Sequence, residues 1–125
     1  MPIADPDSFV DFVGQQAGDS LRMVLFSTPD SYHIAYARDD LRDTYTGGQA
    51  DEIVAYMRAV TDPEMPDPIK ETTGELESLV LTFEHAVGIV LPVTDGNVLV
   101  SLDPTAASQL HDFTSSCQEF LTDEG

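Results

Sequence analysis

The sequence predicts one α+β domain built on a five-stranded antiparallel sheet. The chain has 125 residues, the size of a single ordinary domain, so we expect residues 1–125 to share one core. Apolar residues make up 42% of the chain, close to the average of globular proteins. Segments with a helical apolar period and segments typical of strands follow one another in the order helix, two strands, helix, three strands, helix.

The first third of the chain predicts a helix followed by a β-hairpin. Asp5 and Pro6 supply an N-cap residue and a proline for the first helical turn. Apolar residues then recur at helical spacing as far as Ala17. Residues 21–27 are apolar enough for a strand covered on both faces, and residues 32–37 alternate with the period of two expected for a second strand.

The middle of the chain predicts a helical region with a break inside it. Residues 38–60 carry apolar side chains at helical spacing, with Asp39 placed to cap the helix and Gly47-Gly48 placed to interrupt it. Three prolines follow within a few residues. Because proline interrupts regular structure, residues 61–74 are expected to form an exposed loop.

The strongest strand signal lies between residues 75 and 102. Three apolar segments are separated by turn residues at 84–85 and by an Asp-Gly pair at 95–96, which predicts three consecutive antiparallel strands. An isolated two-stranded hairpin is only marginally stable, so the first two strands are expected to join these three in one sheet. The Asp-Pro pair at 103–104 repeats the capping pair of the first helix and predicts the start of a final helix.

The charge of the chain is strongly unbalanced. Five Lys and Arg residues stand against 23 Asp and Glu residues, which gives a formal net charge of −18. Such a chain could be a nucleic-acid mimic, a cation-binding surface or a halophilic protein with a solvated acidic shell. The acidic residues are spread along the whole chain, whereas a mimic or an acidic tail would concentrate them. Even spacing with almost no lysine favours a halophilic protein whose self-repulsion is screened by salt.

The same composition argues against several partners and compartments. A basic patch that could release counterions from DNA or RNA is missing from the sequence, so nucleic acid and anionic membrane surfaces are not expected partners. No apolar run is long enough to span a bilayer, and the N-terminus does not resemble a signal segment. We therefore expect a cytoplasmic protein. The single cysteine, Cys117, allows neither an internal disulfide nor a multi-cysteine metal site.

Two residues are candidates for ligand contact. Arg38 is one of very few cations, and it could hold an anionic ligand, hold a partner's carboxylate or neutralise nearby aspartates. His33 lies on the small-residue face of its strand, beside Ala35 and Ala37, where it could line a shallow cleft.

One pair of aspartates is a candidate for a divalent cation. Asp39 and Asp43 are four residues apart, so one helical face could carry both carboxylates as hard oxygen ligands. The alternative is that Asp39 caps the helix and Asp43 lies in its first turn, where the helix dipole favours a negative charge.

No complete catalytic constellation is recognisable. Cys117 and His111 are six positions apart, so on a helix they point away from each other, and Cys117 falls on the apolar face. The phosphate-loop, dinucleotide-binding, zinc-protease and nucleophile-elbow motifs are not found in the sequence. We therefore predict no catalytic residue, no metal site of that kind and no cofactor.

Aromatic residues point to a protein interface. Tyr32, Tyr36 and Tyr45 are expected in the core or at a dimer interface, where aromatic residues are enriched. A five-stranded open sheet also has edge strands that can pair with a second copy, so a homodimer is expected.

Two resemblances guide the functional hypothesis. The chain resembles a family of short, acidic, uncharacterised proteins from halophilic archaea through three segments: Tyr36-x-Arg38-Asp39-Asp40-Leu41-x-x-x-Tyr45, Phe83-Glu84-x-Ala86-Val87 and Asp5-x-Asp7-Ser8-Phe9-x-Asp11-Phe12. The element order is similar to that of roadblock/LC7 domains in the profilin-like group. This second resemblance implies a homodimer and an adaptor or regulatory role, often toward small GTPases.

The leading hypothesis from the sequence is a non-enzymatic cytoplasmic adaptor or regulatory domain that acts through protein contacts. The alternative is a small-ligand sensor or enzyme with a pocket between the sheet and a helix, in which Arg38 or His33 would supply the polar contact. A pocket lined by convergent polar groups would favour the second hypothesis, and a flat apolar face would favour the first.

Overall fold

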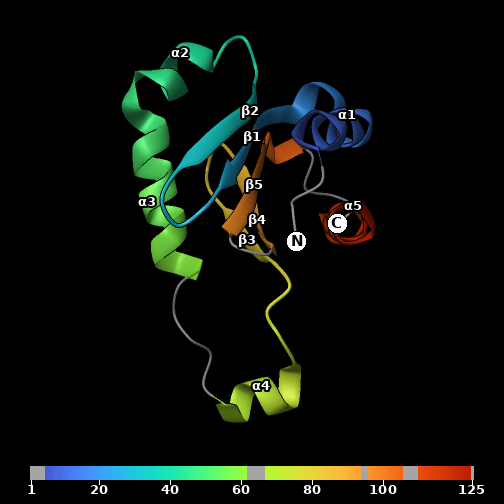
Figure 1. Ribbon diagram of the computed structural model, residues 1–125. Coiled ribbons are helices and arrows are strands. Elements are labelled where there is room, and N and C mark those ends of the chain that lie inside the picture. Colours follow the sequence, from blue (N-terminus) through green and yellow to red (C-terminus); the bar gives the residue numbers. More distant parts are fainter. Residues whose placement is uncertain (1–4, 62–66, 94–95, 106–109, 125) are drawn as a thin grey trace.

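A computed structural model describes residues 5–61, 67–93, 96–105 and 110–124. One five-stranded sheet forms its centre, and helices lie on both faces (Figure 1). The longer helices are α1 (Pro6–Ala17), α3 (Ala50–Thr61) and α5 (Leu110–Glu124), and the short ones are α2 (Arg42–Thr44) and α4 (Asp67–Thr73). The strands are β1 (Leu21–Ser27), β2 (Tyr32–Ala37), β3 (Leu79–Thr82), β4 (Val87–Val93) and β5 (Gly96–Leu102). The predicted α+β class and the five-stranded antiparallel sheet are confirmed.

The sheet joins the first two strands to the last three. Its order is β2-β1-β5-β4-β3, and every neighbouring pair is antiparallel. β1 lies between β2 and β5, so the N-terminal hairpin is completed by the C-terminal half of the chain. β2 and β3 are the two edge strands.

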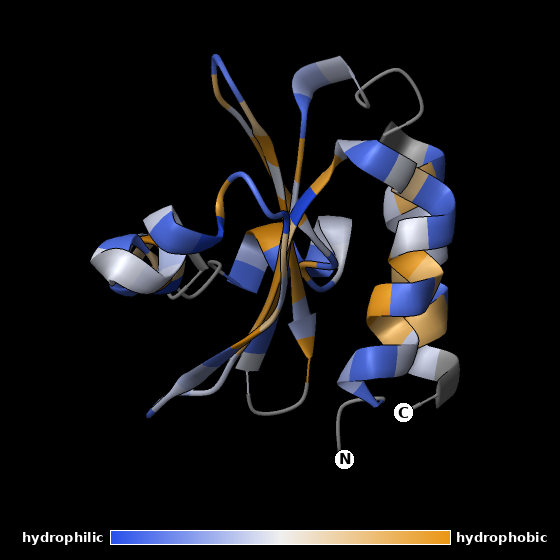
Figure 2. Ribbon diagram, turned by 90° about the horizontal axis from the view of Figure 1, so that it is seen from above, coloured by the Kyte–Doolittle hydropathy of each residue, from blue (hydrophilic) through white to orange (hydrophobic). Residues whose placement is uncertain are grey.

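The helices α1 and α5 cover one face of the sheet (Figure 2). Phe9 of α1 meets Phe26 of β1 edge to face, with ring centroids 5.9 Å apart, and meets Phe120 of α5 at 5.7 Å. Phe12 stacks on Phe120 at 4.8 Å. Aromatic pairs at these distances add to the stability gained from buried area, so this face is closely packed.

The helix α3 covers the opposite face. Its buried residues Val54 and Met57 pack with Met23 and Leu25 of β1 and with Leu99 of β5. Alternate residues of the central strands β4 and β5 therefore contribute to two separate apolar clusters, as the pleat of a sheet requires.

Helix α1 begins and ends where the sequence predicts. The Asp5 carboxylate accepts hydrogen bonds from the Ser8 backbone N–H at 3.3 Å and from the Ser8 hydroxyl at 3.0 Å, so Asp5 is the N-cap. Gly18 follows the last turn with a φ of 58°. The predicted break at the paired glycines is also confirmed, because Gly48 has a φ of 119° within a kinked turn, Tyr45–Gln49, that separates α2 from α3.

The expectation of a loop over residues 61–74 is wrong for its second half, where α4 forms. Pro68 lies in the first turn of α4, a position that needs no N–H donor. Gly74, with a φ of 84°, donates its N–H to the Lys70 carbonyl and ends the helix. Residues 67–74 are exposed as expected, and α4 projects away from the sheet and the other helices (Figure 1). Residues 62–66 lie outside the described part of the chain.

One expectation about a helix start is not met. Asp39 does not cap a helix, because α2 begins at Arg42 and Leu41 takes the N-cap position. Asp103 bonds to two arginines, and a 3-10 turn follows it at Pro104 and Thr105. Residues 106–109 lie outside the described part of the chain, so a helix start at 103–104 stays a prediction. The predicted turn at Glu84 and His85 is present, but the turn at 95–96 lies partly outside the described residues.

Candidate functional site

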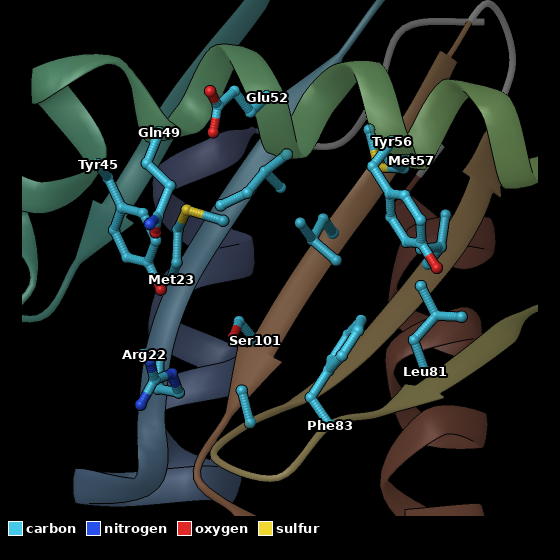
Figure 3. A pocket seen from close by; sticks show the side chains of 15 residues that line it. Arg22, Met23, Tyr45, Gln49, Glu52, Tyr56, Met57, Leu81, Phe83 and Ser101 are labelled. Carbon is cyan, nitrogen blue, oxygen red and sulfur yellow. The ribbon is translucent and has the colours of Figure 1, made fainter.

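A cleft of about 460 Å³ opens between α3 and the sheet (Figure 3). The sheet side is formed by residues of β1, β5, β4 and β3, and the other side by α3 and the kinked turn before it. Ligand pockets in proteins have volumes of roughly 300 to 1,000 Å³, so the cleft has the size of a small-molecule site.

Small side chains on the sheet keep the cleft open. Ala86, Gly88 and Ser101 all line it. A Cβ atom at Gly88 would lie 3.6 Å from Leu99 Cδ1, an ordinary contact distance, and the backbone there has no positive φ. A Cβ at position 88 would therefore make only ordinary van der Waals contacts, and a longer side chain there would extend into the cleft.

Arg22 is the cationic residue of the cleft, and a sheet irregularity places it there. The pairing of β1 with β5 shifts register between Leu21 and Met23. Arg22 lies at this shift and lines the cleft beside Met23. Bulges of this kind reorient a side chain relative to a regular strand, and they are frequent next to functional sites.

The cleft has a polar end and an apolar end. In Figure 3, Arg22, Ser101 and the Tyr45 hydroxyl lie toward one end, and Tyr56, Leu81 and Phe83 toward the other. Gln49 adds an amide on the polar side, while Glu52 lies on α3 and is exposed.

The apolar end is open to solvent. The Tyr56 side chain is 52% exposed and Phe83 is 50% exposed, although both are large. Leu81 and Met57 continue this lining toward the interior. Exposed apolar residues of this size beside a cleft mark a surface suited to binding an apolar group.

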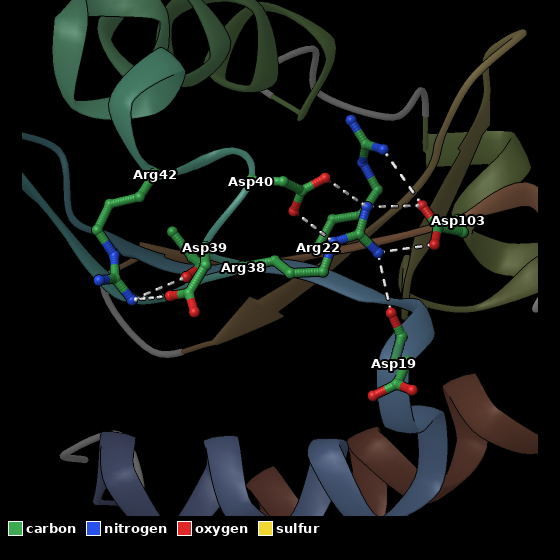
Figure 4. A network of polar contacts seen from close by, with 8 residues as sticks. Asp19, Arg22, Arg38, Asp39, Asp40, Arg42 and Asp103 are labelled. Carbon is green, nitrogen blue, oxygen red and sulfur yellow. Dashed lines mark hydrogen bonds and ion pairs between the residues drawn. The ribbon is translucent and has the colours of Figure 1, made fainter.

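An arginine–aspartate network joins the polar end of the cleft to the neighbouring loops (Figure 4). The two Asp103 oxygens accept hydrogen bonds from Arg38 Nη1 at 2.7 Å and from Arg22 Nη1 at 3.2 Å. Arg38 Nε also donates to Asp40 at 2.7 Å, and Arg38 Nη1 donates to the Asp19 carbonyl at 2.9 Å. Asp103 is therefore shared by two guanidinium groups, and Arg38 is its closer partner.

This network shifts the acidity of its members. Hydrogen bonds from Arg38 lower the pKa of Asp103 below its ordinary value of 3.8; partial burial opposes the effect, and the bond from Arg22 adds to it. The bond from Arg38 likewise lowers the pKa of Asp40. The two carboxylates in turn raise the pKa of Arg38 above its already high value. Both aspartates are accordingly anions at neutral pH.

Arg22 keeps donors that this network does not use. Its side chain is only 18% exposed, and its Nε is buried without a hydrogen-bond partner among the described residues. A buried polar group without a partner costs free energy, so the unfilled donor capacity of Arg22 is a distinctive property of this site.

The sequence matches one known domain family over most of its length. A model of a domain of unknown function, DUF7522, matches residues 7–122. The chain belongs to the DUF7522 family. No curated protein matches it. The match covers α1 through most of α5, so the sheet, α3 and the whole cleft lie within the DUF7522 domain.

The structure places the two predicted ligand contacts of this DUF7522 domain outside the cleft. Arg38 binds Asp40 and Asp103, so it neutralises nearby aspartates, one of the three roles considered for it. It adjoins the cleft only through Asp103, which it shares with Arg22. His33 is exposed on the edge strand β2 and does not line the cleft.

Asp39 and Asp43 do not share a helical face, because Asp39 precedes α2 and Asp43 lies within it. Asp39 forms an ion pair with Arg42 at 2.9 Å, and its side chain is 93% exposed. Among the described residues, no group of three or more His, Cys, Asp or Glu side chains is arranged to hold a metal ion. Likewise, no helix in the described part of the chain is both long and apolar enough to cross a membrane.

The three candidate interface tyrosines have different environments. Tyr32 donates its hydroxyl to Asp51 Oδ1 at 2.6 Å, which ties the edge strand β2 to α3 and raises the pKa of Tyr32. Tyr36 is half-buried against the α1 and α5 side of the core. Tyr45 is 5% exposed and lines the cleft, so in the single chain it is not available as a surface contact.

Cys117 lies in the core as its place on the apolar face predicts. It is fully buried in α5, and this burial raises the pKa of its thiol to about 12. A thiol with so high a pKa is a poor nucleophile, because the reactive species is the thiolate.

The sequence did not point to Arg22, Gly88 or Ser101 as site residues. Arg22 did carry a signal, since it is the only charged residue within the otherwise apolar segment of 21–27. Its position in the cleft depends on the register shift against β5, which only long-range pairing sets. Gly88 and Ser101 look like ordinary small residues of buried strands until α3 is placed above them.

Proposed function

We propose that this domain binds a small, largely apolar molecule in the cleft between α3 and the sheet, as a sensor or regulatory module. The observation that carries the proposal is the cleft itself: a volume of about 460 Å³, an apolar lining and one cationic residue, Arg22. Sites for small molecules have this composition, a mainly apolar wall with a few polar groups that orient the ligand.

Binding of a neutral probe, octanol, tests the proposal. Isothermal titration calorimetry in molar KCl should detect saturable binding to the native protein. In Gly88→Leu the new side chain would extend into the cleft, and we expect at least a tenfold loss of affinity, equivalent to about 1.4 kcal/mol.

A matched control separates blocking of the cleft from a general effect of the substitution. Gly14 lies in α1, on the opposite face of the sheet, and a Cβ there meets no atom within 4 Å. Gly14→Leu should bind octanol like the native protein. Equal octanol affinity in Gly88→Leu and Gly14→Leu would contradict the proposal.

A second candidate function is a homodimeric adaptor. Edge strand β3 pairs only with β4 among the described strands, and its Val80 side chain is 41% exposed. An open apolar edge favours pairing with another chain. The similarity of the element order to roadblock/LC7 domains supports the same role. That similarity implies a small GTPase as a class of partner for the adaptor.

The oligomeric state tests this second candidate. Sedimentation equilibrium in molar KCl should show a dimer for the native protein and a monomer for Val80→Lys, because a charge at the edge opposes pairing. Ile69→Lys, on the projecting helix α4, places the same charge on another exposed apolar residue and should remain a dimer. If the native protein is a monomer at high protein concentration, the homodimer is rejected. If affinity capture in molar KCl recovers the bait without a partner protein, the adaptor role is rejected.

We also propose that the protein works in a salt-rich cytoplasm. The net charge of −18 and its even spread along the chain support this setting. In molar salt the Debye length is about 3 Å, so repulsion between exposed carboxylates is largely screened.

A further inference from the structure

Building on the proposed function, we infer that the natural ligand is an amphipathic monocarboxylate, with its carboxylate on Arg22 and its apolar body extending under α3 toward Tyr56 and Phe83. The inference adds the chemical class of the ligand and its orientation to the proposed cleft. It depends on how the charges at the polar end are distributed.

Arg22 has hydrogen-bond donors that the fold leaves unused. A guanidinium has five N–H donors. In the described structure one atom of this group, Nη1, donates to Asp103 at 3.2 Å, and Nε is buried without a partner. A carboxylate is the anion whose two oxygens match the planar guanidinium fork, so it would satisfy donors that the fold leaves unused.

Arg38 is the closer partner of Asp103. It donates to Asp103 at 2.7 Å, which is shorter than the 3.2 Å bond from Arg22. Asp40 contacts Arg38 and not Arg22, so the two arginines and two aspartates of the network balance in number but not in position. Arg22 is the member of this network that lines the cleft, so the charge presented to a ligand there is positive.

The charges around the cleft limit the charge of the ligand. One guanidinium lines the cleft, and the whole chain carries a net charge of −18. Glu52, an exposed residue of α3, adds a carboxylate to the lining. These negative charges would repel a polyanion, whereas a single carboxylate needs only the one cation that is present.

The remaining lining of the cleft fits an apolar ligand body. Beyond Arg22 and Ser101 the cleft is lined by Met57, Leu81 and the open pair Tyr56 and Phe83. A hydrocarbon chain or ring that extends from the carboxylate would cover these side chains and remove them from water. One end of the cleft thus fits the head of such a molecule, and the other end fits its body.

The experiment compares octanoate with octanol, which share the same hydrocarbon chain. Calorimetry at neutral pH in molar KCl should give an affinity for octanoate about tenfold higher than for octanol in the native protein. Charge-assisted hydrogen bonds to a carboxylate are stronger than those to a hydroxyl, and salt weakens a partly buried ion pair less than an exposed one. In Arg22→Gln we expect this preference to disappear, so that octanoate binds no more tightly than octanol.

Two controls keep the result interpretable. Arg42→Gln removes the same charge from an exposed arginine that does not line the cleft, and it should keep the native preference for octanoate. Asp103 retains Arg38 in Arg22→Gln, so the network is not left without a cation, and circular dichroism verifies that this variant is folded. Arg22→Lys, which keeps the charge without the planar fork, should retain only part of the preference.

The outcomes distinguish the two proposals. If octanol and octanoate both bind to Gly88→Leu as they do to the native protein, the cleft is not the site and the proposed function fails. If octanol binds in the cleft but octanoate binds no better, or if the preference persists in Arg22→Gln, the monocarboxylate inference fails while the proposed function stands.

Discussion

At the scale of single residues, Asp103 is the most consequential side chain outside the core. It follows the last strand, and its carboxylate joins Arg22 of β1 to Arg38, which follows β2. One side chain thus connects the ends of three neighbouring strands. The Asp-Pro pair at 103–104 predicts a helix start, and that local pattern contains no information about the distant arginines that Asp103 binds.

We expect Asp103→Asn to lower the free energy of unfolding by about 1 to 2 kcal/mol at neutral pH, since charge-assisted hydrogen bonds are lost and Asp103 is partly exposed. The folded-state pKa of Asp103 lies below 3.8, so its stabilising contribution is present above pH 3.8 and is lost as the pH falls through the lowered pKa. Urea unfolding from neutral pH to about pH 3 should therefore show the native and variant proteins converging.

Asp39→Asn is the matched control for this prediction. Asp39 also pairs with an arginine, but its side chain is 93% exposed. An exposed ion pair contributes on the order of 0 to 1 kcal/mol, so this variant should unfold close to the native midpoint. An equal loss of unfolding free energy in Asp103→Asn and Asp39→Asn would mean that sharing Asp103 between two arginines adds no stability.

At the scale of elements, features set by residues close together in the sequence were predictable, and features set by contacts between distant segments were not. Local signals were sufficient for α1, whose cap and terminal glycine are adjacent in sequence, and for the break at Gly48. They were misleading for α4, because prolines that interrupt a helix interior are compatible with its first turn. The alternative hypothesis from the sequence included a pocket between the sheet and a helix, but local signals could not give its residues, because Arg22 lines it at a register shift set by pairing with the distant strand β5.

The cap of α1 provides a prediction at this scale. Asp5 accepts two hydrogen bonds from Ser8, so Asp5→Ala should cost about 1 kcal/mol of the free energy of unfolding. Asp7→Ala, in the first turn of the same helix, removes an equal charge without a capping bond and should cost less. Urea denaturation of both variants in molar KCl measures the difference, and equal costs would show that the charge matters and the cap does not.

At the scale of the whole molecule, the acidic surface dominates the behaviour in solution. A net charge of −18 on a domain of 125 residues creates self-repulsion that opposes the compact state when it is not screened. The fold itself was predictable from the sequence at this scale, because hydrophobic periodicity reports which segments share a core. The function was not, since family membership identifies a domain of unknown function and supplies no site.

We expect the domain to lose structure as salt is removed. Dialysis from molar to millimolar KCl lengthens the Debye length from about 3 Å to many times that value, so distant carboxylates begin to repel one another. Far-ultraviolet circular dichroism should show a cooperative loss of signal over this range. An unchanged spectrum would indicate that the acidic surface has another purpose.

The unequal packing of the two sheet faces has a consequence for motion. The α1 and α5 face is held together by three aromatic ring contacts, whereas α3 stands over a cleft and is preceded by the glycine kink at Gly48. Amide protons of α3 should therefore exchange with solvent through local opening well before those of β1 and β5. A ligand that fills the cleft would slow this exchange, so occupancy of the site would be transmitted as rigidity of one helix on the molecular surface.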